Sequence, residues 1–229
     1  EFIESLWLED GLSQNTLQAY QRDIISLSKF LKLHNQTLLH CSEENLQDYI
    51  MSRHAQTKAS SANRRLTVFK RFFRWANQMQ KMSLDPTIRL DAAKPELRLP
   101  KSVSELNVQA LLNAPDLQTP LGLRDKSMLE MLYATGLRVS ELVSLQIHQL
   151  HLQEGWVKII GKGNKERIVP IGSVALKLLE IYVNQIRVHL DIKKGHEDFI
   201  FLNRSGSRLS RISVFNLIKS LAIATGIHK

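Results

Sequence analysis

The stretch D-P-T-I-R-L-D-A-A-K-P-E-L-R-L-P at residues 85–100 divides the sequence into two parts. It carries three prolines and charges of both signs, and proline both starts and stops regular structure. A chain of 229 residues is long enough for two ordinary domains. We therefore expect an N-terminal domain at residues 1–84, a linker at 85–100 and a C-terminal domain at 101–229.

Helical periodicity dominates residues 1–81, where apolar residues recur every three or four positions. Serine side chains can accept a hydrogen bond from a free backbone N–H in the first turn of a helix. The pattern predicts three main helices, the first two of them begun by a serine cap, at about Ser13–His34, Ser42–Ala55 and Ser60–Gln80.

The C-terminal part combines helices with a small sheet. The β-branched runs W-V-K-I-I and E-R-I-V-P flank G-K-G-N-K, which indicates a β-hairpin at 156–170. Gly136 stands where a helix commonly ends in a left-handed cap. The other expected elements are helices at 104–112, 121–135, 139–145, 173–190 and 210–224, short strands near 147–152 and 199–202, and a turn at 203–207. The predicted fold class is mainly α with a small antiparallel β-sheet: a helical domain followed by a mixed α/β domain.

Charge and composition limit the partners of the chain. Lys and Arg total 31 against 22 Asp and Glu, a net charge of +9, which favours a polyanionic partner such as nucleic acid. The single cysteine, Cys41, excludes an internal disulfide framework and fits a reducing cytoplasm. No apolar run approaches the roughly 20 residues of a membrane span, so we expect a cytoplasmic protein without membrane insertion.

A basic stripe follows the helix expected at 60–80. Eight Lys or Arg and no Asp or Glu lie between Tyr49 and Leu84. Steps of about 100° per residue place polar side chains on one helical face and apolar ones opposite. A solvated surface usually mixes charges of both signs, so the absence of acids favours a face that contacts phosphates and reads base edges in duplex DNA. The stripe consists of Asn63, Arg64, Thr67, Lys70, Arg71, Arg74, Gln78 and Lys81.

Arg138 and Glu141 form the first candidate site. Arg138 follows a glycine turn and starts a helix, where backbone N–H groups and the helix dipole favour an anion. A guanidinium there can bind a phosphate through two hydrogen bonds. Glu141 lies three residues later on the same helical face and can hold the guanidinium. The alternative is an ordinary Arg–Glu pair on the surface.

Lys162 in the turn of G-K-G-N-K is the second candidate. The glycines allow a tight turn and a close approach to a ligand, and the ammonium group can protonate an alkoxide leaving group. The alternative is a solvent-exposed turn lysine. His148 and His151 lie three residues apart without a third ligand, so we expect no metal site.

Two long motifs carry a resemblance to a known family. They are A-T-G-L-R-V-S-E-L at 134–142 and I-I-G-K-G-N-K-E-R-I-V-P-I-G at 159–172. Together with W-L-E-D-G-L-S-Q-N-T-L-Q-A-Y-Q-R-D-I at 7–24 and K-A-S-S-A-N-R-R-L at 58–66, the sequence resembles the tyrosine recombinases of the phage integrase family that resolve bacterial chromosome dimers.

The resemblance implies a helical core-binding domain and a catalytic domain that clamp duplex DNA. Arg138 would bind the scissile phosphate, Glu141 would support it, and Lys162 would protonate the leaving 5′ hydroxyl. A tyrosine would form a 3′-phosphotyrosine without any cofactor. We also expect Lys165 and Arg167, beside the hairpin turn, and Arg211 to contact DNA. The implied partners are a dif-like DNA site, an XerC-like recombinase in a heterotetramer and an FtsK-like DNA translocase.

The sequence departs from the family pattern in one respect. The family continues with a His-x-x-Arg motif, a second histidine and the nucleophilic tyrosine, and Tyr20, Tyr49, Tyr133 and Tyr182 lie in none of these contexts. We interpret Tyr133 as a core residue of a buried helix. We therefore expect an incomplete catalytic domain that binds DNA without cleaving it. The alternatives are a catalytically silent DNA-binding or accessory protein of the same fold, and a helical protein-interaction module with a basic surface.

Overall fold

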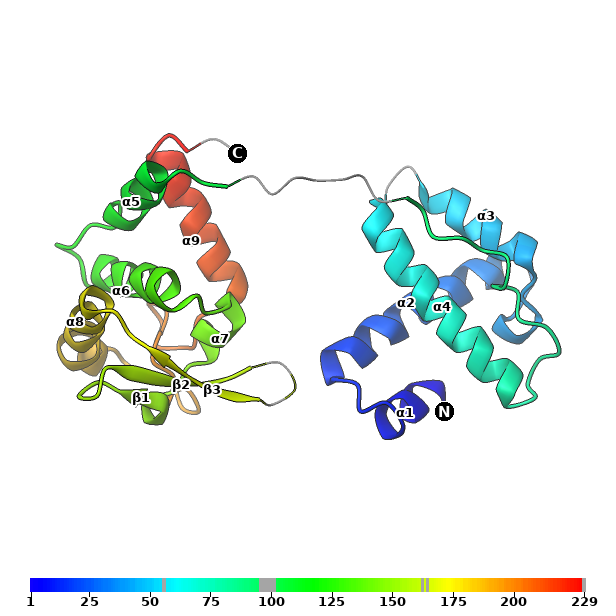
Figure 1. Cartoon of the computed structure of the whole chain (residues 1–229), viewed down its shortest axis with the longest axis horizontal. Coiled ribbons are helices and arrows are strands. Elements are labelled where there is room, and N and C mark those ends of the chain that lie inside the picture. Colours follow the sequence, from blue (N-terminus) through cyan, green and yellow to red (C-terminus); the bar gives the residue numbers. More distant parts are fainter. Residues whose placement is uncertain (55–56, 95–101, 162, 164, 228–229) are drawn as a thin grey trace. The chain divides into compact units, whose positions relative to one another are not determined.

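The computed structural model describes residues 1–54, 57–94, 102–161, 163 and 165–227. The chain forms two compact units, Glu1–Pro100 and Lys101–Lys229, each with its own hydrophobic core (Figure 1). We call them unit 1 and unit 2 and describe each by itself. None of the helices in the described part of the chain has the length and apolar character needed to span a membrane.

All regular secondary structure in the described residues of unit 1 is helical. Helix α4 crosses α2, and both contribute to one core with α1 and α3 (Figure 1). Its aromatic centre includes Phe2, which packs edge-on against Phe72, and Tyr49, which packs edge-on against Phe69. The elements are α1 (Phe2–Leu8), α2 (Gln14–Leu33), the short 3-10 helix η1 (Leu38–His40), α3 (Glu43–His54) and α4 (Ala59–Gln78).

Part of the expected linker belongs to unit 1. Leu90 lies in the core of the unit, and Thr87 is buried and hydrogen-bonded to Asp85. The Asn63 side chain on α4 donates to the Ala93 carbonyl at 2.7 Å and accepts from the Ala93 N–H at 2.8 Å. Residues 85–94, which we expected to be linker, therefore pack on unit 1, because apolar Leu90 and the Asn63 amide hold them on the helices.

Unit 2 combines helices with a three-stranded antiparallel sheet in the order β1-β2-β3. In Figure 1 the sheet forms one end of the unit, α5 and the C-terminal end of α9 lie toward the other, and α6 runs between them. The elements are α5 (Glu105–Asn113), α6 (Pro120–Thr135), α7 (Val139–Ser144), the 3-10 helix η2 (Ile147–Gln149), β1 (Leu150–His151), β2 (Trp156–Ile160), β3 (Glu166–Pro170), α8 (Ser173–Ile181), the π-helical turn η4 (Tyr182–Ile186), the 3-10 turn η5 (Arg187–His189) and α9 (Arg211–Ala224).

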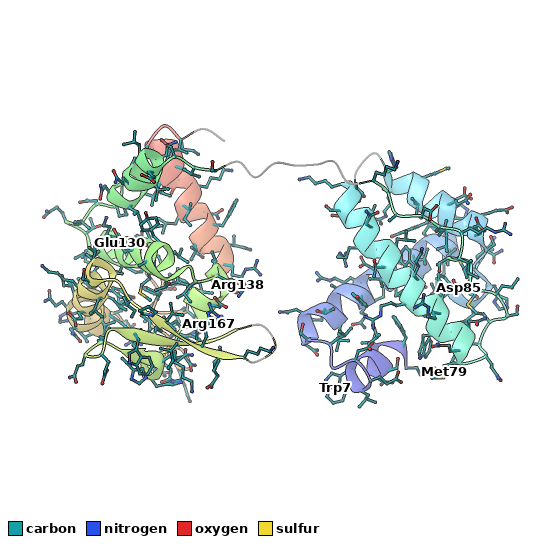
Figure 2. All side chains as sticks on the ribbon, viewed as in Figure 1. Trp7, Met79, Asp85, Glu130, Arg138 and Arg167 are labelled. Atoms are coloured by element: carbon teal, nitrogen blue, oxygen red, sulfur yellow. The ribbon has the colours of Figure 1, made fainter. Side chains whose placement is uncertain are left out.

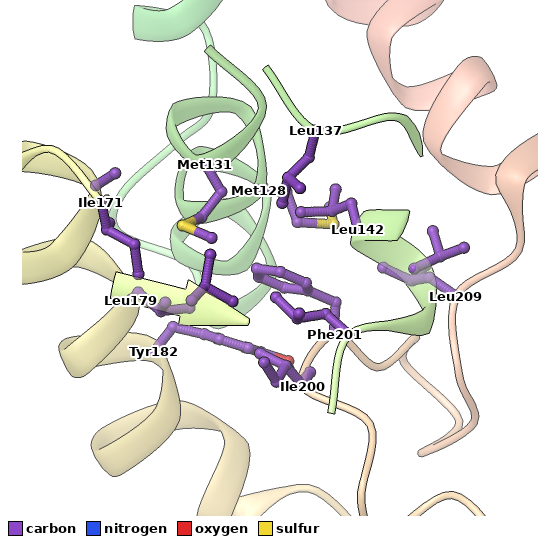
Figure 3. Close-up of a cluster of buried hydrophobic side chains, with 14 of the residues drawn as sticks. Met128, Met131, Leu137, Leu142, Ile171, Leu179, Tyr182, Ile200, Phe201 and Leu209 are labelled. Carbon is purple, nitrogen blue, oxygen red and sulfur yellow. The ribbon is translucent and has the colours of Figure 1, made fainter. Parts of the chain in front are cut away.

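The core of unit 2 joins α6, α7 and α8 to the segment before α9. Met128 and Met131 of α6 point toward Leu179, Tyr182 and Phe201 (Figure 3). The buried Tyr182 hydroxyl donates to the Ile200 carbonyl at 3.1 Å and accepts from the Leu202 N–H at 3.3 Å. This pair of bonds satisfies the hydroxyl inside the core and fixes residues 200–202 against the start of η4.

The serine caps confirm the helix starts predicted from the sequence. Ser42, Ser104 and Ser210 each accept a hydrogen bond from the backbone N–H three residues later, at 3.0–3.3 Å. Gly136 ends α6 in the left-handed conformation, with φ of 61°. Ser13 precedes α2 as expected, but its hydroxyl bonds to the Thr16 hydroxyl at 3.0 Å instead of to the backbone.

Two expectations about unit 2 were wrong in part. Residues 199–202 form no continuous strand; only single antiparallel pairs join Gln146 to Phe199 and Leu202 to Arg208. Ile200, Phe201 and Leu202 are all buried, so this apolar run fills the core rather than alternating across a sheet. The helix expected at 173–190 is regular only to Ile181 and continues as η4 and η5.

Candidate active site and nucleic-acid interface

Arg138 lies at the junction between α6 and α7. Gly136 turns the chain, Leu137 is buried beneath the turn, and Arg138 is the extended residue that precedes the first turn of α7. This arrangement leaves the Arg138 side chain 68% exposed at the surface of unit 2 (Figure 2). The local sequence therefore anchors the backbone in the core while the guanidinium faces solvent.

The carboxylate of Glu141 supports Arg138 from below. Its Oε2 accepts the Arg138 backbone N–H at 2.8 Å, and its Oε1 accepts from Arg138 Nη1 at 3.0 Å. The Glu141 side chain is only 6% exposed. The pair therefore differs from an ordinary surface pair at its carboxylate, because a buried carboxylate needs its partners to offset the loss of solvent.

A second arginine completes the bonding of Glu141. Arg167 on β3 donates from Nη1 to Oε1 at 3.0 Å and from Nη2 to Oε2 at 2.8 Å. Figure 2 marks Arg167 on the strand and Arg138 at the start of α7. The hydrogen bonds from Arg167, followed by those from Arg138, hold the pKa of Glu141 at about 2 although burial acts to raise it. In return, the Glu141 carboxylate raises the pKa of Arg167.

Arg167 therefore has a partner that the sequence did not indicate. We expected it to contact DNA, whereas the structure brings it to Glu141, 26 residues earlier in the chain. A signal was present in the strand pattern: Arg167 pairs with the buried Ile159 and shares the face of the half-buried Val169. An arginine on the inward face of a strand requires an anionic or carbonyl partner.

The hairpin between β2 and β3 has the predicted strands. The Gly161 N–H donates to the Lys165 carbonyl at 2.8 Å and closes its base. Lys165 is exposed, and Lys158 pairs with Glu166 at 2.8 Å across the sheet. Lys162 lies outside the described residues, so its role stays a prediction.

The basic stripe on α4 has acidic partners from other helices. Arg64 pairs with Asp23 of α2, Arg71 with Asp10, and Lys81 with Glu1. Acids are therefore missing only near α4 in sequence, since Asp23, Asp10 and Glu1 come to the stripe from the first 23 residues of the chain. Lys70 and Arg74 have no carboxylate within ion-pair distance in the described part of the chain, and Arg74 is exposed.

The remaining predicted DNA contacts differ in whether their side chains already bond within the protein. Asn63 uses its side-chain amide on the Ala93 backbone, and Thr67 donates its hydroxyl to the Asn63 carbonyl at 2.9 Å. Arg211 is the exposed first residue of α9. It lies on the rim of an apolar groove between α5, α7 and α9 that includes Val143 and Phe215.

His151 and Tyr49 are engaged in contacts within their own units. His151 stacks on Trp156 with ring centroids 3.5 Å apart, and the described residues contain no group of three metal-ligating side chains. Tyr49 is buried and donates to the Ser26 hydroxyl at 3.0 Å. Tyr133 is 66% exposed, which corrects our interpretation of it as a core residue: α6 buries its middle turns, and its last turn reaches the surface.

Comparison with known proteins identifies the family. Residues 101–229 match the phage integrase family, and residues 1–80 match the N-terminal SAM-like domain of phage integrases. The chain belongs to the phage integrase family. This confirms the resemblance drawn from the two long motifs.

The phage integrase family members most informative here are XerD recombinases. The tyrosine recombinase XerD of Ralstonia nicotianae is 44% identical over 228 residues, which are 99% of this chain and 74% of the relative. XerD of Yersinia pestis is 42% identical over 228 residues, which are 99% of this chain and 76% of the relative.

Solved structures show the same phage integrase fold. A lambda integrase dimer bound to a COC′ core site matches with a TM-score of 0.76 and 17% identity over 100% of this chain and 63% of that chain. The XerH site-specific recombinase bound to a palindromic difH substrate, in a post-cleavage complex, matches with a TM-score of 0.75 and 16% identity over 93% of this chain and 64% of that chain.

Proposed function

We propose that this chain is a site-specific recombinase of the XerD type, which cuts and rejoins duplex DNA through a 3′-phosphotyrosine intermediate. The observation that carries the proposal is the exposed Arg138 guanidinium held by the buried Glu141 carboxylate. An arginine whose position is fixed before the substrate arrives can stabilise negative charge on a phosphate without reorganising during the reaction.

Arg138 has donors to spare for a phosphate. A guanidinium carries five N–H groups, and the Glu141 carboxylate takes one from the Arg138 side chain. The neighbouring helix α7 has only six residues, so we assign the anion to the guanidinium and not to the helix dipole. In the proposed reaction, Arg138 binds the non-bridging oxygens of the scissile phosphate and stabilises the charge that develops on them.

The chemistry proposed for the site is a transesterification. A tyrosine oxygen attacks the phosphorus, the bond from phosphorus to the 5′ oxygen breaks, and the departing oxygen takes a proton. We assign this proton to Lys162 of the hairpin. Attack by a 5′ hydroxyl on the phosphotyrosine reverses the step and joins the strands, so neither a metal nor a nucleotide is consumed. Glu141 is the supporting carboxylate.

Unit 1 supplies the proposed DNA-binding face. Lys70 and Arg74 are the best candidates to bind phosphates, because neither has a carboxylate partner in the described part of the chain. Arg64 and Arg71 are held by carboxylates that leave part of each guanidinium exposed. The full proposed set of DNA contacts comprises Asn63, Arg64, Thr67, Lys70, Arg71 and Arg74 in unit 1 and Lys165 and Arg211 in unit 2.

The cellular role that we propose follows the XerD relatives. It is the resolution of chromosome dimers and the segregation of chromosomes at cell division, in the cytoplasm. The proposed partners are a dif-like DNA site, an XerC-like recombinase in a heterotetramer and an FtsK-like DNA translocase. The support for this role is 39–44% identity to XerD recombinases over nearly the whole chain.

Covalent attachment to DNA tests the proposal. The full protein encoded by the reading frame that contains residues 1–229 is incubated with a duplex nicked near the cleavage position. Covalent protein–DNA complexes are then separated on a denaturing gel. We expect Arg138→Ala to lower the yield by at least about a hundredfold while DNA affinity changes little. The control Arg204→Ala removes an exposed arginine from the turn at 203–207 and should leave the yield unchanged.

Two outcomes of this experiment count against the proposal. A normal yield with Arg138→Ala would show that Arg138 does not bind the scissile phosphate. No covalent complex from the unmodified protein on any dif-like site, with DNA binding retained, would favour the silent DNA-binding protein. Tyr133→Phe should not alter the yield, because the family nucleophile follows a His-x-x-Arg motif and Tyr133 lies before Arg138.

A further inference from the structure

The Glu141 carboxylate is fully bonded by two arginines from different elements. It accepts the backbone N–H and one side-chain N–H of Arg138, and a two-point fork from Arg167. These four bonds match the roughly four acceptor positions of an ionised carboxylate. The arrangement is therefore closed at Glu141 and most open at Arg138, whose side chain is 68% exposed against 38% for Arg167.

The charge balance of the cluster depends on Arg167. One carboxylate and two guanidinium groups leave a net positive charge of one. If Arg167 were absent, Glu141 and Arg138 would form a neutral pair, and both carboxylate oxygens would attract the Arg138 guanidinium. With Arg167 in place, the carboxylate oxygens are occupied and the cluster keeps an excess positive charge, with Arg138 as its more exposed cation.

Arg167 also connects Glu141 to the hairpin. It pairs with Ile159 on β2 and lies two residues after Lys165, whose carbonyl closes the base of the turn. Gly161 allows this approach: a Cβ at that position would lie 3.1 Å from Arg167 Nη1 and 3.7 Å from Glu141 Oε1. The hairpin and the start of α7 are thus joined through one arginine–carboxylate pair.

We infer that Arg167 is a positioning residue, which fixes Glu141 and so presents the Arg138 guanidinium to the scissile phosphate. This rests on the proposed function of Arg138. It replaces our expectation that Arg167 contacts DNA directly. Arg167 does not touch the reacting atoms. It occupies the Glu141 carboxylate, which would otherwise bind more of the Arg138 guanidinium and keep it from the phosphate.

Kinetics at saturating protein separate positioning from DNA contact. The full protein encoded by the same reading frame is compared with its variants Arg167→Ala, Arg167→Gln and Arg167→Lys. Two quantities are measured: the single-turnover rate of covalent complex formation, and the DNA affinity between about 50 and 200 mM salt. We expect Arg167→Ala and Arg167→Gln to lower the saturated rate roughly 10- to 100-fold, with the salt dependence of binding unchanged. Arg167→Lys should recover part of the rate, because its ammonium group keeps the charge but not the fork.

Two further readouts exclude a merely structural effect. If Arg167 acts through Glu141, the double variant Arg167→Ala with Glu141→Gln should be no slower than the slower single variant. Loss of the fork should also raise the pKa of Glu141 from about 2. The rate of Arg167→Ala should therefore fall more steeply than that of the unmodified protein as the pH is lowered from about 7 to about 5.

Matched variants distinguish a failure of the inference about Arg167 from a failure of the proposed function. Lys158→Ala breaks the exposed pair with Glu166 on the same two strands and should leave the rate unchanged. A normal saturated rate for Arg167→Ala and Arg167→Gln, with a salt dependence weaker by about one phosphate contact, would overturn the inference and make Arg167 a DNA contact. If Arg138→Ala also reacts normally, the proposed function itself has failed.

Discussion

Arg64 of α4 places both terminal nitrogens of its guanidinium on the carboxylate of Asp23, 41 residues earlier on α2. The two distances are 2.5 and 3.0 Å, and the Asp23 side chain is 11% exposed. This pair fastens the two crossing helices of unit 1 at the edge of the proposed DNA-binding face. It also holds the arginine in one orientation while 49% of its side chain stays exposed.

Asp23→Asn should weaken unit 1. The amide cannot accept two charge-assisted bonds, so we expect a loss of about 1–2 kcal/mol in the free energy of unfolding, less than for a fully buried pair because Arg64 is half exposed. Asp10→Asn breaks the more exposed pair with Arg71 and should cost less than about 0.5 kcal/mol. Urea unfolding followed by tryptophan fluorescence measures both, and equal losses would contradict this account of the Asp23 pair.

Lys70→Ala and Arg74→Ala should weaken DNA binding alike for all sequences. Each removed phosphate contact should lower the slope of log affinity against log salt by about one. The control Lys32→Ala removes an exposed cation near the end of α2 and should change neither affinity nor slope. Fluorescence anisotropy with a labelled duplex at several salt concentrations gives both quantities. Unchanged slopes for both stripe variants would show that this face does not contact phosphates.

Glu141 should make unit 2 sensitive to acid. Its pKa is about 2 in the folded chain against 4.5 for an unperturbed glutamate, so its contribution to stability is complete above about pH 5 and is lost as the pH falls toward 2. The shift corresponds to about 3 kcal/mol, and solvent around Arg138 and Arg167 reduces this to about 1–2 kcal/mol.

Glu141→Gln measures this contribution. Its deficit in unfolding free energy should be largest near about pH 7 and should vanish near about pH 2. Trp156, in unit 2, reports the unfolding transition. Glu166→Gln alters an exposed carboxylate of the same sheet and should show less than about 0.5 kcal/mol of deficit throughout. A deficit for Glu141→Gln that does not change with pH would rule out the carboxylate charge as its cause.

Local signals predicted the parts of this fold whose determinants lie close together in sequence. Ser104 and Ser210 bond to an N–H three residues away, and Gly136 ends α6 through its own backbone conformation. The positions of Arg138 and Glu141 were accessible for the same reason, because helix geometry joins residues three apart.

Contacts between distant segments could not be predicted in this way. Asp23 reaches Arg64 only after α2 crosses α4, and Glu141 reaches Arg167 only when the register of β3 is fixed. Tyr133 shows the same limit, since the apolar composition of α6 does not reveal which of its turns the rest of unit 2 covers. Sequence periodicity thus located the arginines and the nearby Glu141, but not the long-range pairs of Arg64 with Asp23 and of Arg167 with Glu141.

Gly206 should not tolerate any side chain. The turn at 203–207 explains the need for a left-handed residue there, but not the close approach of Asp191. The φ of Gly206 is 73°, and a Cβ there would lie 1.7 Å from the Asp191 carbonyl oxygen, so Gly206→Ala adds a backbone clash to the strain of a left-handed residue. Gly195 has φ of 85° with nothing within 4 Å of such a Cβ, so Gly195→Ala isolates the strain alone. We expect a loss of about 1 kcal/mol for Gly195→Ala and at least about 3 kcal/mol for Gly206→Ala. Denaturation followed at Trp156 compares them, and equal losses would mean that Asp191 moves aside without cost.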